Sequence, residues 1–98
     1  MIGIPDKILL HVMDDRSDIR YLDRHLGVSR YAVLQGLDEL KARGLIAFIS
    51  GETKPRVNRE SLVYHDWFNS LSDRLNGETA EYGPIVQREQ QRLAAYAH

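Results

Sequence analysis

The sequence predicts a mainly helical chain with one small β-hairpin. Apolar residues recur at spacings of three and four in five segments, which is the period of a helix with one buried face. Glycine, serine and proline stand where these segments end and begin. A short segment after Gly44 instead has the composition of two strands around a polar turn. The length of 98 residues is typical of one domain.

The first helix is expected to begin at Ile4–Pro5, because proline fits an early helical position where its missing N–H would have no partner. A polar turn at residues 14–16 ends it, and Ser17 is the expected N-cap of a second helix. Gly27 ends that helix, since glycine accepts the left-handed conformation common at helix ends. The apolar faces of the two helices are Ile8, Leu9, Val12 and Met13, and then Ile19, Leu22 and Leu26.

A third helix follows after a very short turn. Ser29 is its expected N-cap and Gly44 its stop signal. Its buried stripe consists of Val33, Leu37 and Leu40. Two helices separated by so few residues must cross steeply to share their apolar faces, and this arrangement is a helix-turn-helix.

The rest of the chain is expected to form a hairpin and two more helices. Strands at 45–49 and 55–58 flank a turn at Ser50–Thr53, and Pro55 places the second strand at a sheet edge because it lacks an N–H. Residues 78–83 are expected to be a linker, with Pro84 starting the last helix. The expected apolar faces of these helices are Leu62, Val63, Trp67, Phe68, Leu71 and Leu75, and then Ile85, Val86, Leu93 and Tyr96 or Ala97.

Composition excludes several classes of function. There is no cysteine, which excludes disulfides, thiolate catalysis and cysteine zinc sites. No apolar run approaches the ~20 residues needed to cross a bilayer, and no signal peptide is visible, so a soluble cytoplasmic protein is expected. The net charge is −1, yet residues 16–59 hold nine Lys and Arg against five Asp and Glu. This mildly basic middle is compatible with a nucleic-acid partner.

The histidines form no recognisable motif in the sequence. His11, His25, His65 and His98 lie far apart, and no His-x-x-x-His or Glu-x-x-His spacing is present. Ser29 has no partner base nearby in the sequence, which argues against nucleophilic catalysis. We therefore expect no metal, no cofactor and no enzymatic activity.

The helix-turn-helix and the hairpin together resemble a winged-helix DNA-binding domain, of the kind found in MarR, ArsR and GntR regulators. The resemblance covers residues 4–60, and the extension at 61–98 matches no family pattern. The residues that carry it are Leu22, Leu26, Gly27, Val28, Ser29, Arg30, Val33, Leu37, Leu40, Gly44, Leu45 and Ile46.

The resemblance implies that the helix after the turn lies in the major groove of double-stranded DNA. Arg30 can then contact guanine and Gln35 adenine, while cations of the hairpin contact phosphates. The expected DNA-binding residues are Ser29, Arg30, Tyr31, Leu34, Gln35, Lys54, Arg56 and Arg59.

The C-terminal extension is expected to build a homodimer. A winged helix closes its own small core, so further apolar helix faces would be exposed unless a second copy covers them. The expected interface residues are Trp67, Phe68, Leu71, Leu75, Ile85 and Leu93. The expected function is that of a small dimeric transcriptional regulator.

Three departures from the family pattern favour a different function. Asp23 replaces a residue that is usually small, Leu34 is apolar where DNA-facing residues are polar, and Asp38–Glu39 would repel phosphates. The alternative is a protein–protein interaction module in a replication, segregation or other assembly. In that case Leu34 and Tyr31 form an apolar contact.

Overall fold

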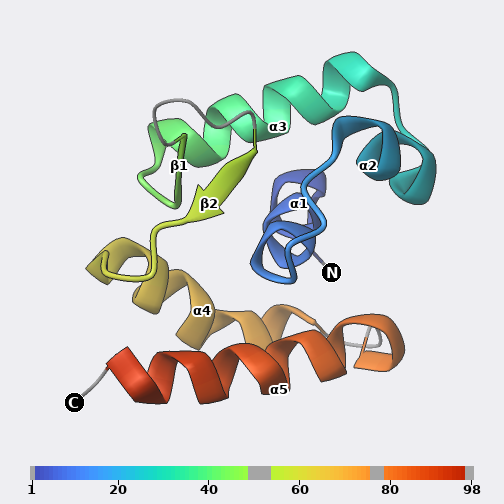
Figure 1. The fold of residues 1–98 in the computed structure, drawn as a ribbon. Helices are drawn as coiled ribbons and strands as arrows, with labels where there is room; N and C mark the ends of the chain where they lie inside the picture. The colour runs from blue at the N-terminus through green and yellow to red at the C-terminus, as the bar shows by residue number, and fades with distance from the viewer. Residues whose placement is uncertain (1, 49–53, 76–78, 97–98) are drawn as a thin grey trace.

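The computed structural model describes residues 2–48, 54–75 and 79–96, and these form five helices and one antiparallel two-stranded sheet (Figure 1). The predicted mainly helical class with a small hairpin is confirmed. The predicted turn at Ser50–Thr53 and the ends at Ile49, Asn76–Gly77 and Ala97 lie outside the described residues. The elements are α1 Ile4–Met13, α2 Ile19–Leu26, α3 Arg30–Ala42, β1 Ile46–Phe48, β2 Pro55–Val57, α4 Leu62–Arg74 and α5 Thr79–Tyr96.

The turn between α2 and α3, and the end of α3, have the predicted capping and stop residues. Gly27 has φ 66° and Gly44 has φ 77°, both in the left-handed region that favours glycine. The Ser29 hydroxyl accepts a hydrogen bond of 3.1 Å from the backbone N–H of Ala32, as an N-cap does. At the start of α2 the prediction is wrong by one residue, because the cap is Asp18 and not Ser17.

Helix α1 lies between two layers. In Figure 1, α3 lies above it, α2 and the strands lie on its two sides, and α4 and α5 lie below it. All six residues from Ile8 to Met13 are buried, so this part of α1 is covered on every side and not along one stripe. At the crossing with α3, a Cβ on Gly36 would lie only 2.5 Å from Cδ1 of Ile8. Glycine therefore permits the close approach of α1 and α3.

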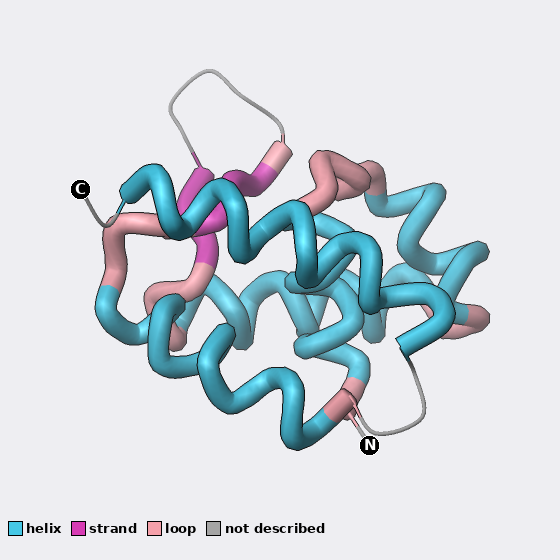
Figure 2. Tube along the Cα trace, turned by 90° about the horizontal axis from the view of Figure 1, so that it is seen from below, coloured by secondary structure: helices cyan, strands magenta, loops and turns pink. Residues whose placement is uncertain are grey.

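The hairpin follows the end of α3 and lies beside α1. Ile46 pairs with Val57, and Phe48 pairs with Pro55 at the far end of the ladder. The side-chain amide of Asn58 donates to the carbonyl of Gly44 at 3.2 Å, which ties the hairpin to the end of α3. Figure 2 shows both strands near one edge of the molecule.

The two C-terminal helices complete the core of the single chain. The side chains expected at a dimer interface are buried within the chain: Trp67, Phe68, Leu71, Leu75, Ile85 and Leu93. Their assignment to an exposed apolar stripe is wrong, because they pack into the core that includes α1. The buried face of α4 begins at Tyr64, whereas Leu62 is 80% exposed and Val63 is 48% exposed.

Helix α5 begins earlier than the sequence suggests. Residues from Thr79 onward are helical and Pro84 lies inside the helix, so the predicted linker and start at Pro84 are wrong. Proline removes the hydrogen bond that residue 84 would donate to the carbonyl of Ala80. In the turn before Pro84, Tyr82 is buried and its hydroxyl lies 3.4 Å from a ring nitrogen of His11, so this part of the helix packs against α1.

A buried carboxylate joins the layers. Glu89 of α5 is fully buried and accepts hydrogen bonds from Arg59 at 2.8 and 2.9 Å, from Tyr64 at 2.6 Å and from Arg92 at 3.1 Å. The two guanidinium groups also donate to the carbonyl of Met13, at 3.1 and 3.0 Å. We call these four side chains and that carbonyl the Glu89 cluster. The predicted phosphate contact of Arg59 is corrected here, because its guanidinium is engaged in this cluster.

The charge state of the Glu89 cluster follows from its contacts. Burial by itself would raise the pKa of the Glu89 carboxyl, but the hydrogen bonds from Arg59, Tyr64 and Arg92 hold that pKa below its usual value. Burial, with the hydrogen bond that Tyr64 donates to Glu89, raises the pKa of the Tyr64 hydroxyl far above its usual value. Glu89 is therefore an ionised acceptor and Tyr64 a neutral donor at neutral pH.

Replacing Glu89 by glutamine should destabilise the protein strongly. Glu89→Gln removes a buried anion and leaves the partly buried guanidinium groups of Arg59 and Arg92 without it. Breaking a fully buried ion pair costs about 3–5 kcal/mol, which is the upper bound here because the arginines are partly exposed. The matched control is Arg88→Ala on the same helix, which removes only the half-exposed pair with Asp14 at 2.9 Å. Such surface pairs contribute less than about 1 kcal/mol. Urea denaturation that finds equal losses in the two variants would contradict this account.

The crossing of α1 and α3 gives a second prediction. Gly36→Ala should lower stability, because overpacking a tight core costs about 1–3 kcal/mol while the gain in helix propensity is about 1 kcal/mol. Ile8→Val removes the clashing Cδ1, so in that background Gly36→Ala should become neutral or stabilising. A double-mutant cycle from denaturation midpoints measures this coupling. The same effect of Gly36→Ala in both backgrounds would refute the close contact.

Candidate functional site

The first half of α3 presents its expected side chains to solvent. Arg30, Tyr31, Leu34 and Gln35 are exposed, and Tyr31 is 68% and Leu34 43% exposed. The opposite face of α3 carries the buried residues Val33, Gly36, Leu37 and Leu40. The helical period thus separates a core face from an exposed face, as the sequence predicted.

A hollow lies where the starts of α2 and α3 meet the hairpin. Three cations converge there, from α2, from α3 and from the residue before β2. The lining residues are Ser17, Asp18, Ile19, Arg20, Arg30 and Lys54. The one carboxylate, Asp18, accepts a hydrogen bond of 2.8 Å from the backbone N–H of Arg20 and so caps α2. This hollow therefore has a surplus of positive charge.

A second hollow extends along α2 and shares residues with the first. It is lined by Asp18, Arg20, Tyr21, Arg24 and His25. Arg20 and Arg24 were not among the predicted site residues. The four-residue spacing of Arg20 and Arg24 in the second predicted helix is the signal that could have found them, because residues four apart share a helix face.

Local contacts limit what the predicted side chains can offer. The Ser29 hydroxyl is used as the cap of α3, and the Gln35 amide donates to the Tyr31 hydroxyl at 2.8 Å. Arg30 lies 3.9 Å from the carboxylate of Asp23, a loose and exposed pair. Arg56 is exposed on β2, opposite Ala47. The structure therefore brings Arg30 and Lys54 together, while Arg59 is engaged in the Glu89 cluster.

The exposed face of α3 changes character along its length. Asp38 and Glu39 are exposed, and Asp38 lies about 12 Å along the axis from Arg30 at 1.5 Å per residue. Beyond them, Phe48 of β1 is 44% exposed, with the Lys41 ammonium 5.7 Å from its ring centre. The start of this face is basic, and its far end is mixed, with two carboxylates, the Lys41 ammonium and an exposed aromatic ring.

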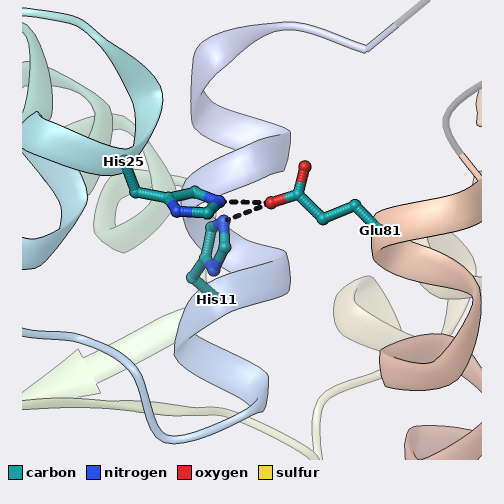
Figure 3. Close-up of side chains that lie close together, drawn as sticks. All are labelled: His11, His25 and Glu81. Carbon is teal, nitrogen blue, oxygen red and sulfur yellow. Dashed lines mark hydrogen bonds and ion pairs between the residues drawn. The ribbon is translucent and has the colours of Figure 1, made fainter.

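A different cluster forms where α1, α2 and α5 meet (Figure 3). The Nε2 atom of His25 is hydrogen-bonded to a carboxylate oxygen of Glu81, and Nε2 of His11 lies 3.8 Å from the same oxygen. The donor atoms of these three residues all lie within 4.8 Å of one another. Among the described residues, this is a group that could hold a metal ion. Sequence spacing could not reveal it, because three separate helices supply its members.

Two tyrosines surround His11 within this cluster. The Tyr21 hydroxyl lies 3.4 Å from Nδ1 of His11, and the Tyr82 hydroxyl lies 3.4 Å from Nε2. Both rings meet the imidazole edge-on, with centres 5.5 Å apart. Burial lowers the pKa of His11 and the nearby His25 lowers it further, which outweighs the opposite effect of Glu81. His11 is therefore neutral near pH 7.

Comparison with known proteins identifies no relative of this chain. No family model matches the chain, and neither the curated proteins nor the solved structures contain a significant match. Within residues 2–48, 54–75 and 79–96, no helix is both long and apolar enough to cross a membrane.

Proposed function

We propose that the chain binds double-stranded DNA as a winged-helix protein. In this proposal α2 and α3 form the helix-turn-helix, and the hairpin of β1 and β2 is the wing. The first half of α3 enters the major groove, while α2 and the wing contact the flanking backbone. The three-residue connection between α2 and α3 and the exposure of the α3 start both support this assignment.

The observation that carries the proposal is the convergence of Arg20, Arg30 and Lys54 on one hollow. These cations come from the three elements that a winged helix would place against DNA. Contacts between cations and phosphates supply most of the sequence-independent affinity for DNA. Arg24 extends the same positive surface along α2.

Base recognition in the proposal falls to Arg30 and Gln35. Arg30 can leave its loose contact with Asp23 and donate two hydrogen bonds to guanine. Gln35 can exchange its bond with Tyr31 for a pair of bonds to adenine. Asp38 and Glu39 follow in the second half of α3, so the carboxylates need not lie among the base contacts.

The biological role proposed with this activity is regulation of transcription by occupying DNA. The six side chains first expected at a homodimer interface are buried in the chain's own core. A homodimer would therefore have to form through a different surface. Leu62 and Val63 at the start of α4 are exposed apolar residues that a second copy could cover. The DNA sequence that the protein prefers would reveal its oligomeric state, because a dimer selects a palindrome and a monomer selects a single half-site.

A second candidate function rests on the apolar part of the same surface. Tyr31 and Leu34 are exposed on the first half of α3, and exposed apolar side chains that gather on one surface often mark a protein interface. Phe48 is a further exposed apolar side chain near the other end of α3. In this alternative the chain is a protein–protein interaction module of a larger assembly, and the carboxylates of α3 supply specificity.

Selection from a pool of random duplexes at two salt concentrations tests the proposal. Arg30→Ala should relax one base position at a cost of about 1–3 kcal/mol. Lys54→Ala should weaken binding to all sequences evenly and reduce the salt slope by about 1, because it removes a phosphate contact. The control is Arg88→Ala. Arg88 pairs with Asp14 at the end of α1, and neither residue lines the hollow.

The outcome separates the two candidates. Enrichment of one sequence by wild type and by Arg88→Ala, with the losses given for Arg30→Ala and Lys54→Ala, supports DNA recognition. No enriched sequence, with binding lost at physiological salt, would reject it and favour the protein–protein alternative. An equal loss in Arg88→Ala would show that the surface is assigned wrongly.

A further inference from the structure

We propose that His11, His25 and Glu81 form a binding site for a divalent transition-metal ion of the zinc class. Their two imidazole nitrogens and one carboxylate oxygen point toward a common space between α1, α2 and α5 (Figure 3). This site is distinct from the surface of α3 and the hairpin. It does not depend on DNA binding.

The donor set selects the kind of metal. Zinc accepts histidine nitrogen and carboxylate oxygen at about 2.0–2.2 Å, whereas calcium and magnesium require sets made of oxygen. Two donors of a tetrahedral ion at these distances lie roughly 3.3–3.6 Å apart. The donor atoms here lie within 4.8 Å of one another, so side-chain rotations that move them by about 1 Å would bring them into place. Two nitrogens and one oxygen with an open fourth position also match known zinc coordination.

The surroundings of His11 prepare it as a ligand. A metal-binding histidine usually directs its second ring nitrogen at a hydrogen-bond acceptor, which fixes the tautomer and the ring orientation. Here the Tyr21 hydroxyl faces Nδ1 of His11 at 3.4 Å. With the proton on Nδ1, the Nε2 lone pair faces the carboxylate of Glu81, 3.8 Å away, and the hydroxyl of Tyr82, 3.4 Å away. A metal ion bound at Nε2 would replace the contact with Tyr82.

An ion can reach the site from solvent. His25 is 39% exposed and Glu81 is 47% exposed, and the hollow along α2 opens beside His25. The hydrogen bond between His25 and Glu81 must open to admit the ion. Both side chains have room to move because they are partly exposed. Solvent can supply the fourth ligand.

Binding should also stabilise the fold. The three ligands lie on separate helices, and residues 11 and 81 are distant in the sequence, so the complete site exists only in the folded chain. A ligand that binds only the folded state raises its stability with concentration. Zinc should therefore raise the melting temperature of the wild type in a concentration-dependent way.

The test is titration of metal-stripped protein with Co²⁺, followed by visible absorption, and with Zn²⁺, followed by calorimetry and melting temperature. The ligand variants are His25→Ala and Glu81→Gln, whose partly exposed positions should leave the fold intact, as circular dichroism can verify. The controls are Glu39→Gln, an exposed carboxylate on α3, and His98→Ala, a histidine near the chain end. A further variant, Tyr21→Phe, should bind at least about 10-fold more weakly if the hydroxyl positions His11.

The expected result is saturable 1:1 binding by wild type and both controls, with the cobalt spectrum of a four-coordinate ion. His25→Ala and Glu81→Gln should lose this binding and the zinc-dependent rise in melting temperature. Absence of saturable binding by wild type would overturn the proposal and leave a simple histidine–carboxylate pair. Undiminished binding in either ligand variant, or loss of binding in His98→Ala, would overturn it as well.

Discussion

The buried carboxylate of Glu89 is the interaction on which the arrangement of the chain depends. A charge removed from water must be paired and hydrogen-bonded, or its burial costs more than a small domain can bear. Glu89 receives its hydrogen bonds from Arg59, Tyr64 and Arg92, and the two arginines also bind the last carbonyl of α1. One carboxylate thus joins α5 to α4, to α1 and to the segment after β2.

The two layers of the molecule use their side chains differently. The layer of α4 and α5 uses its large apolar side chains and the carboxylate of Glu89 in the interior. The layer of α2, α3 and the hairpin leaves cations and aromatic side chains exposed. The histidine cluster lies at a second junction, where Glu81 brings α5 to α1 and α2. Residues 81 and 89 lie about 12 Å apart along α5, so the helix is held at two points.

Local signals explain what the sequence could predict. The caps and stops at Gly27, Ser29 and Gly44 depend on a few neighbouring residues, and they were predicted correctly. The helical period likewise identified the core and exposed faces of α3. The exposed part of the candidate site could be predicted for the same reason.

Long-range packing explains what the sequence could not predict. In the sequence, Arg59 is a cation next to the hairpin, which suggests a phosphate contact. In the fold it donates to Glu89, thirty residues away in the chain. The early part of α5 packs Tyr82 into the core, and the apolar faces of α4 and α5 are buried within the chain itself. The cluster of His11, His25 and Glu81 exists only once three helices meet.

Amide hydrogen exchange of the free protein, compared between α5 and α1, tests the central claim most directly. If the Glu89 cluster makes the two layers one cooperative unit, the amides around Glu89 should exchange only through the global opening that also exposes α1. Their opening free energies should then equal each other and the free energy of unfolding. Exchange of α5 through a separate opening of much lower free energy, with α1 still protected, would contradict the account.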